Sequence, residues 1–180
     1  MKYIFILLLG FFSVFLLSSN NLKSKSYSKL ANKITASTAL KLKKEKELYL
    51  IGTGGQMMDD IQMMAMSFEY FHQVDVKEGR KLLIFSIEMY LDAINNDNKI
   101  HPYLHEYPFT AKNVEIRIWC HNPDGSDVPS DKIYYISSID GVLSFYIDDP
   151  ENYSRKTIHE ETYEEALQAI SFSVLDKKIN

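Results

Sequence analysis

The sequence predicts an α+β protein, in which an N-terminal pair of helices packs on an antiparallel meander of three to four strands and a C-terminal helix follows. Three observations lead to this fold class. Apolar residues recur at helical spacing over residues 57–94, they alternate strictly over 114–121 ahead of an Asp140-Gly141 hairpin signal, and helical spacing returns after Thr162. Because helices flank a meander, we expect them to cover one face of the sheet.

The chain divides into four segments by composition. We predict a leader over residues 1–20, a basic helical spacer over 21–47, a single α+β domain over 48–175 and a frayed tail over 176–180. The part after the leader is long enough for one core and too short for two. A hydrophobic fraction of 46% and an aromatic fraction of 13% argue against wholesale disorder.

The leader has the layout of a secretory signal. Met1 and Lys2 precede an uncharged apolar run over residues 3–17, and small polar residues follow. There is no Ala-x-Ala cleavage site, so cleavage and retention as a transmembrane anchor stay equally open. Residues 3–22 come close to the roughly 20 apolar residues that crossing a bilayer requires. We expect an exported protein that is either secreted or periplasmic, or anchored in a membrane.

Charge is distributed unevenly along the chain. Residues 21–50 carry eight lysines and two glutamates, whereas residues 51–180 carry 11 basic and 22 acidic side chains. An acidic body argues against a nucleic-acid partner, because phosphate binding requires a positive field. The basic segment is interpreted as a solvated helical spacer, with contact to anionic lipid headgroups beside an anchor as the alternative.

A glycine corner, Gly52-Thr53-Gly54-Gly55, has two interpretations. In the first, it joins two helices, with Thr53 and Gln56 forming a capping box. In the second, it is a phosphate-binding turn between a strand and a helix. The third glycine of the dinucleotide fingerprint is replaced by Met57, and no second strand-helix-strand unit follows, so we favour the capped corner and expect no cofactor.

Two helices are predicted after this corner. The first has its apolar stripe over residues 57–71, and the second is capped by Asp75 with Glu78 at the reciprocal position. The apolar residues of the second helix continue until Asn95. The stripe of the first helix consists of Met57, Ile61, Met64, Ala65, Phe68 and Phe71.

Three histidines are the candidate metal ligands. His101 and His105 are four residues apart, as in a helical zinc pair, and His121 would be a third ligand. Prolines at 102 and 108 argue against a regular helix across the pair. We therefore expect no metal, and interpret residues 99–109 as an ordered aromatic loop that contains Tyr103 and Tyr107.

The strand over residues 114–121 has one apolar face. Cys120, the sole cysteine, lies on that face and is interpreted as a core residue, because its neighbour His121 points to the opposite face. Trp119 and Arg117 lie on the outer face. We expect a binding surface formed by Trp119, Arg117, Tyr103 and Tyr107.

The remaining elements follow from turn and capping signals. Strands over 132–139 and 142–147 flank Asp140-Gly141, a strong hairpin signal. The polar loop over 122–131 resembles half of a calcium loop but lacks its spacing and terminal glutamate. Thr162 and Glu165 form a capping box that opens the last helix.

Three stretches of this chain, residues 51–59, 80–83 and 103–109, resemble uncharacterised exported proteins of intracellular bacteria. The resemblance covers about residues 45–120 and implies export without implying an activity. Two functions are carried forward. The first is an exported or membrane-anchored, non-enzymatic binding or envelope-associated protein whose partner is a protein or envelope component. The alternative is a small metal-dependent hydrolase, which requires His101, His105 and His121 to converge.

Overall fold

A computed structural model describes the backbone of residues 27–179 and the side chains of residues 27–171. The predicted leader, the choice between a signal and a transmembrane anchor, and the expected membrane contact through residues 3–22 concern segments outside the described residues. Over the described part of the chain, no helix has both the length and the apolar composition needed to cross a membrane.

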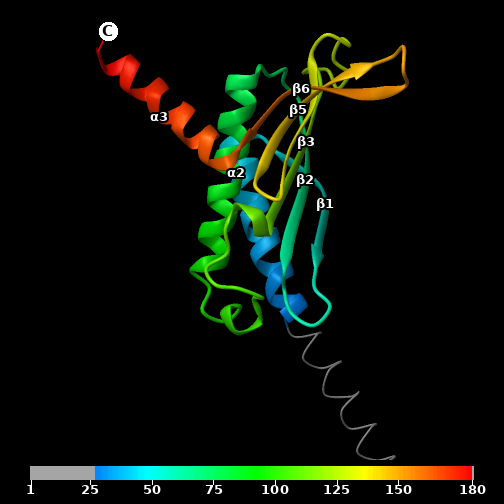
Figure 1. Cartoon of the computed structure of the whole chain (residues 1–180). Coiled ribbons are helices and arrows are strands. Elements are labelled where there is room, and N and C mark those ends of the chain that lie inside the picture. The colour runs from blue at the N-terminus through cyan, green and yellow to red at the C-terminus, as the bar shows by residue number, and fades with distance from the viewer. Residues whose placement is uncertain (1–26, 180) are drawn as a thin grey trace, which may run out of the picture.

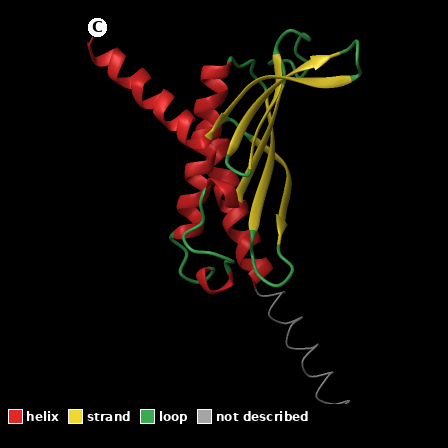
Figure 2. Cartoon of the chain, in the orientation of Figure 1, coloured by secondary structure: helices red, strands yellow, loops and turns green. Residues whose placement is uncertain are grey.

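The protein has the predicted α+β class, with helices on one face of a six-stranded mixed sheet (Figures 1 and 2). The expected meander of three to four strands is too small, because two strands before α2 and one after β5 join it. Besides a helix over residues 27–46, the elements are β1 (Tyr49–Gln56), β2 (Met63–Tyr70), α2 (Val76–Asn95), η1 (His101–Tyr103), η2 (Ala111–Asn113), β3 (Val114–Cys120), β4 (Ile133–Ile139), β5 (Val142–Asp149), β6 (Ser154–Thr162) and α3 (Tyr163–Ile179).

The strands lie in the sheet in chain order, β1-β2-β3-β4-β5-β6. Every neighbouring pair is antiparallel except β2 and β3, which run parallel with Met64 opposite Val114 and Phe68 opposite Ile118. A parallel pair needs a crossover, and α2 provides it by running back across the sheet between β2 and β3. The edges of the sheet are therefore β1 and β6.

The helix over residues 27–46 is part of the core. Tyr27, Ala31, Ile34 and Leu42 are buried at helical spacing, while all the lysines of this helix except the half-buried Lys46 are exposed. The Tyr27 hydroxyl donates a hydrogen bond of 2.8 Å to the carbonyl of Met58, which ties this helix to the loop after β1. Most of the segment expected as a solvated spacer thus packs into the domain.

The predicted helix over residues 57–71 is wrong, because β1 and β2 form a hairpin there. The apolar residues there were compatible with a helix because residues four apart, such as Met64 and Phe68, share one face in a helix and also in a strand. Met66 is fully buried between them, as a strand requires. Strand β2 is also interior to the sheet, so Ala65 on its other face is buried and the alternation is lost.

The capping corner is wrong for the same reason. Thr53 lies within β1 and pairs with Met66 of β2, so it caps no helix. The phosphate-binding alternative also fails, since Gly52, Gly54 and Gly55 lie along a strand that is followed by another strand rather than a helix.

Helix α2 is confirmed with its predicted cap. The Asp75 carboxylate accepts a hydrogen bond of 2.7 Å from the backbone N–H of Glu78, and the reciprocal half of the box is present. The helix lies very close to β5, because a Cβ built at Gly79 would come within 3.0 Å of the Phe145 ring. Glycine at this position lets α2 pack directly on the sheet.

Strands β3 to β5 are confirmed, including the buried alternation of β3 and the turn at Asp140-Gly141. Asp140 and Gly141 have φ angles of 51° and 74°, as a tight hairpin turn requires. The last helix, α3, opens at the predicted capping box, where the N–H of Glu165 donates to the Thr162 hydroxyl at 3.2 Å. It projects away from the sheet (Figure 1) and its backbone is helical through the expected tail to Ile179.

Candidate functional site

The three candidate histidines have different structural neighbours. His101 Nε2 lies 2.9 Å from the carbonyl oxygen of Asn95, at the end of α2. His105 Nδ1 lies 2.7 Å from the Asp60 carboxylate, whereas the ring of His121 packs against Phe71. Among the described residues, no group of three or more histidine, cysteine, aspartate or glutamate side chains is arranged to hold a metal. The hydrolase alternative therefore has no metal centre in this part of the chain.

His105 and Asp60 join two loops. Their hydrogen bond raises the pKa of the imidazole and lowers the pKa of the carboxyl group. Backbone hydrogen bonds beside them, from Ile61 N–H to the Tyr103 carbonyl and from His105 N–H to the Ile61 carbonyl, measure 2.8 and 2.9 Å. The pair thus reinforces the attachment of the 99–109 loop to the loop between β1 and β2.

Cys120 is a core residue, as predicted. Its side chain is buried on the face of β3 that packs against the helices, and burial raises the pKa of the thiol to about 12. A thiol with this pKa forms almost no thiolate at neutral pH, which removes the nucleophile that a cysteine mechanism needs.

The four residues of the expected binding surface lie against different elements. Tyr103 packs on Tyr27 of the first helix, and Tyr107 stacks on His101 at the end of α2. Trp119 packs on Tyr135 of β4. The contacts of Tyr103 and Tyr107 are thus with the helices and their loops, and those of Trp119 are with the sheet.

An aromatic cluster crosses the outer face of the sheet, the face opposite the helices. Trp119, Tyr135 and Tyr146 are register neighbours on β3, β4 and β5, with ring centroids 4.8 and 5.3 Å apart. The guanidinium of Arg155 on β6 lies 5.1 Å from the Tyr135 ring centroid and 5.5 Å from that of Tyr146. We call these four residues the outer aromatic cluster. Tyr135 is only 4% exposed although it lies outside the core between sheet and helices.

A polar row lies beside this cluster on the same face. Arg117, Ser137, Ser144 and Glu160 are consecutive register partners across β3 to β6. Arg117 forms an ion pair with Glu115, and the Ser144 hydroxyl donates to the Glu160 carboxylate at 3.2 Å. The outer face therefore presents aromatic rings next to charges of both signs.

The hairpin of β5 and β6 extends this face beyond the body of the sheet (Figure 1). Its turn is ordered by Asn152, whose side-chain amide donates to the Asp149 carboxylate at 2.9 Å. Tyr153 is the last residue of the turn and is 97% exposed. Sequence reasoning missed Tyr135, Tyr146, Tyr153 and Arg155, although the pairing of β4 with β5 across Asp140-Gly141 would have placed Tyr135 and Tyr146 on adjacent strands.

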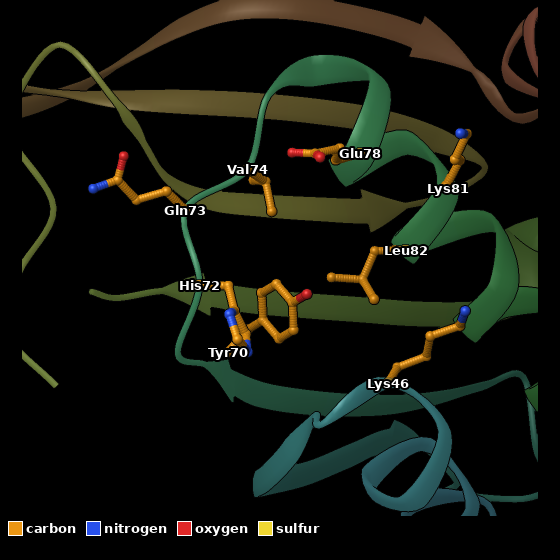
Figure 3. A pocket seen from close by; sticks show the side chains of 8 residues that line it. All are labelled: Lys46, Tyr70, His72, Gln73, Val74, Glu78, Lys81 and Leu82. Carbon is orange, nitrogen blue, oxygen red and sulfur yellow. The ribbon is translucent and has the colours of Figure 1, made fainter. Parts of the chain in front are cut away.

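A polar cavity of about 380 Å³ opens between the first helix, the end of β2 and the start of α2 (Figure 3). Its lining combines the cations Lys46 and Lys81 with the carboxylate of Glu78. Burial, then the charges of Cys120, Glu47 and Glu78, raise the pKa of the Tyr70 hydroxyl that lines the cavity. Lys46 lies 4.3 Å from the Phe85 ring centroid and Glu78 completes the cap of α2, so these groups have structural contacts.

The lining of this cavity favours neither an anion nor a cation, because charges of both signs face it. The outer face is different in that it gathers aromatic and arginine side chains on one surface. No family model, curated protein or solved structure matches the chain.

Proposed function

We propose that the protein is an exported or membrane-anchored binding protein without catalytic activity, whose outer sheet face binds a protein or another envelope component. The observation that carries the proposal is the outer aromatic cluster, whose rings lie outside the core between the sheet and the helices. Figure 2 shows that the helices cover the other face of the sheet. Tryptophan, tyrosine and arginine are the residues that contribute most often to the energy of protein interfaces.

The contacts within the cluster favour binding. Trp119 and Tyr146 are partly exposed while their rings rest on the buried ring of Tyr135. Side chains that are already held by neighbours lose little conformational entropy when a partner docks. The adjacent Arg117, Glu115 and Glu160 provide charges of both signs, which suits a polar protein surface better than a polyanion.

The proposed location rests on residues 1–20 and on the lysines that follow them. Fractionation of cells that produce the full chain, with N-terminal sequencing of the mature protein, tests it. A new N-terminus near residue 20 in a soluble extracellular or periplasmic fraction would establish secretion, and an intact Met1 in membranes would establish an anchor. An intact chain in the soluble cytosol would contradict export.

The binding surface is tested by substitution at Trp119. The tagged chain and its Trp119→Ala variant are used to capture partners from the cells that produce them, with Met58→Ala as the control because Met58 is 87% exposed on the distant hairpin loop. We expect Trp119→Ala to lose the captured partner and to keep the circular dichroism spectrum of the folded protein. Equal capture by Trp119→Ala and the parent chain would contradict the assignment of this face.

A further inference from the structure

The two edges of the sheet differ in how they are protected against pairing with another strand. Edge strands expose unpaired N–H and C=O groups, and charged side chains are the usual protection against pairing. Strand β6 carries Arg155, Lys156, Glu160 and Glu161, whereas β1, Tyr49-Leu-Ile-Gly-Thr-Gly-Gly-Gln56, carries no charge. All residues of β1 except Gly52 are exposed, and Ile51 is 53% exposed. Strand β1 is therefore the edge that is open to pairing.

Two glycines of β1 are not required by the packing of a single chain. A Cβ at Gly52 would meet only the Ser67 side chain, at 3.6 Å, and one at Gly54 would meet only Ala65, at 3.7 Å; both are ordinary contacts. Neither glycine has a positive φ. Glycine inside a strand costs roughly 0.5–1 kcal/mol relative to alanine and often marks a place where another backbone approaches closely. Gly55 is different, since a Cβ there would come within 2.8 Å of the Met63 carbonyl.

We infer that β1 is the interface between two copies of this chain, which pair antiparallel about a two-fold axis at Thr53. In this register Thr53 faces its own copy and Gly52 faces Gly54, so residues that point to the same face of the sheet lie opposite one another. Antiparallel pairing about Thr53 also places the large side chains of Tyr49, Leu50 and Ile51 in one copy beside the glycine-rich half of β1 in the other. Parallel pairing would instead set bulky residues against bulky residues.

Charge supports a second copy as the occupant. Residues 41–47, before β1, carry four lysines and two glutamates, and Asp59 and Asp60 lie after it. Antiparallel pairing brings the basic end of one copy next to the acidic end of the other, whereas the uncharged strands between them introduce no repulsion. The arrangement is self-complementary, as an interface with two-fold symmetry must be.

An apolar groove continues the same surface. It has a volume of about 370 Å³ and lies between the first helix and the start of β1, lined by Ala36, Ala39, Leu40, Lys43, Tyr49 and Leu50. Leu40 is 70% exposed and Leu50 is 40% exposed. A second copy joined at β1 would place the end of its own β1 beside this groove, which reduces the exposure of the apolar surface at that edge.

Disulfide cross-linking of the full-length chain in cells tests the inference. Thr53→Cys places two thiols directly opposite each other, at a Cβ separation of about 4.5–5.5 Å for paired residues. Under mild oxidation we expect a reducible band at twice the mass of the chain. When two differently tagged copies are produced together, that band must contain both tags. Thr157→Cys, exposed on the opposite edge strand β6, is the matched control and should give no such band.

A second pair of variants tests whether the strands themselves pair. In the Thr53→Cys background, Ile51→Lys should remove most of the cross-linked band, while Ile158→Lys, an equivalent exposed isoleucine on β6, should leave it intact. Absence of a band from Thr53→Cys, an equal band from Thr157→Cys, or a band that holds a different protein in place of the second tag would each overturn the inference. An undiminished band with Ile51→Lys would do so as well.

Discussion

At the scale of single residues, the sole cysteine is a core residue. Cys120 is buried and its pKa is raised to about 12. We expect iodoacetamide at pH 8 to leave Cys120 unmodified in the folded protein and to modify it once the protein is unfolded, as measured by mass spectrometry. The added thiol of Thr157→Cys, exposed on β6, is the positive control for reagent access. Rapid labelling of native Cys120 would contradict its burial.

The pair formed by His105 and Asp60 gives a prediction about pH. The raised pKa of His105 stabilises the fold below the ordinary histidine value of 6.5, and this contribution is lost as pH rises through the folded pKa. The lowered pKa of Asp60 stabilises the fold above the ordinary aspartate value of 3.8, and this contribution is lost as pH falls through the folded pKa. Both contributions are therefore present together between about pH 4 and 6.5.

Thermal melting across pH tests this window. The difference in stability between the parent chain and His105→Gln should be largest near pH 5 to 6 and should shrink above the histidine pKa. Asp60→Asn should show the same profile, and combining both substitutions should add nothing further, because they remove one interaction. Profiles that do not depend on pH would show that the pair is not charged in the folded protein.

At the scale of the elements, the capping box of α3 is the simplest contribution to isolate. The Thr162 hydroxyl accepts from the N–H of Glu165, and the Glu165 carboxylate accepts from the N–H of Thr162 at 2.8 Å. Thr162→Ala should lower the free energy of unfolding by about 0.5–2 kcal/mol. Chemical denaturation measures the change, and Glu164→Ala, an exposed position between the two residues of the box, should have a smaller effect.

Strand β3 provides a comparison between its two faces. Ile116 and Ile118 are fully buried against the helices, so Ile116→Ala and Ile118→Ala should each cost roughly 2–5 kcal/mol through the cavity that is left. Arg117, on the outer face with a side chain that is 33% exposed, contributes an ion pair worth about 1 kcal/mol or less. A larger loss for Arg117→Ala than for Ile118→Ala, measured by denaturation, would reverse the assignment of the two faces.

Local sequence signals predicted the elements that depend on local physics. Helix α2 has a capping box and a long apolar stripe, β3 has strict alternation, and β4 and β5 flank a turn of positive φ. Strand β2 was missed because it is interior to the sheet and buried on both faces, so its apolar and polar residues do not alternate. Strand β1, its hairpin partner, was missed with it. Strand β6 was missed because most of its residues are exposed and polar. Its place is determined by pairing with β5.

At the scale of the whole molecule, only the part of the proposed binding face that lies on β3 was predictable. Alternation along β3 placed Trp119 and Arg117 away from the core. The packing of Tyr135 and Tyr146 beside Trp119, and of Arg155 over them, depends on the register of four strands and on bulges in β4 and β6. No periodicity within one segment contains that information. The grouping of Tyr103 and Tyr107 with Trp119 failed because the loop that holds them packs at the end of α2.

Photo-cross-linking at the outer face tests the proposed function most directly. A photoreactive amino acid at position 155, over the outer aromatic cluster, is compared in producing cells with the same group at position 58, the exposed methionine of the hairpin loop. We predict an adduct between position 155 and a molecule other than this chain, which disappears with Trp119→Ala. An adduct of equal yield with the same molecule from position 58, or no such adduct from position 155, would contradict the proposal that the outer sheet face is the binding surface.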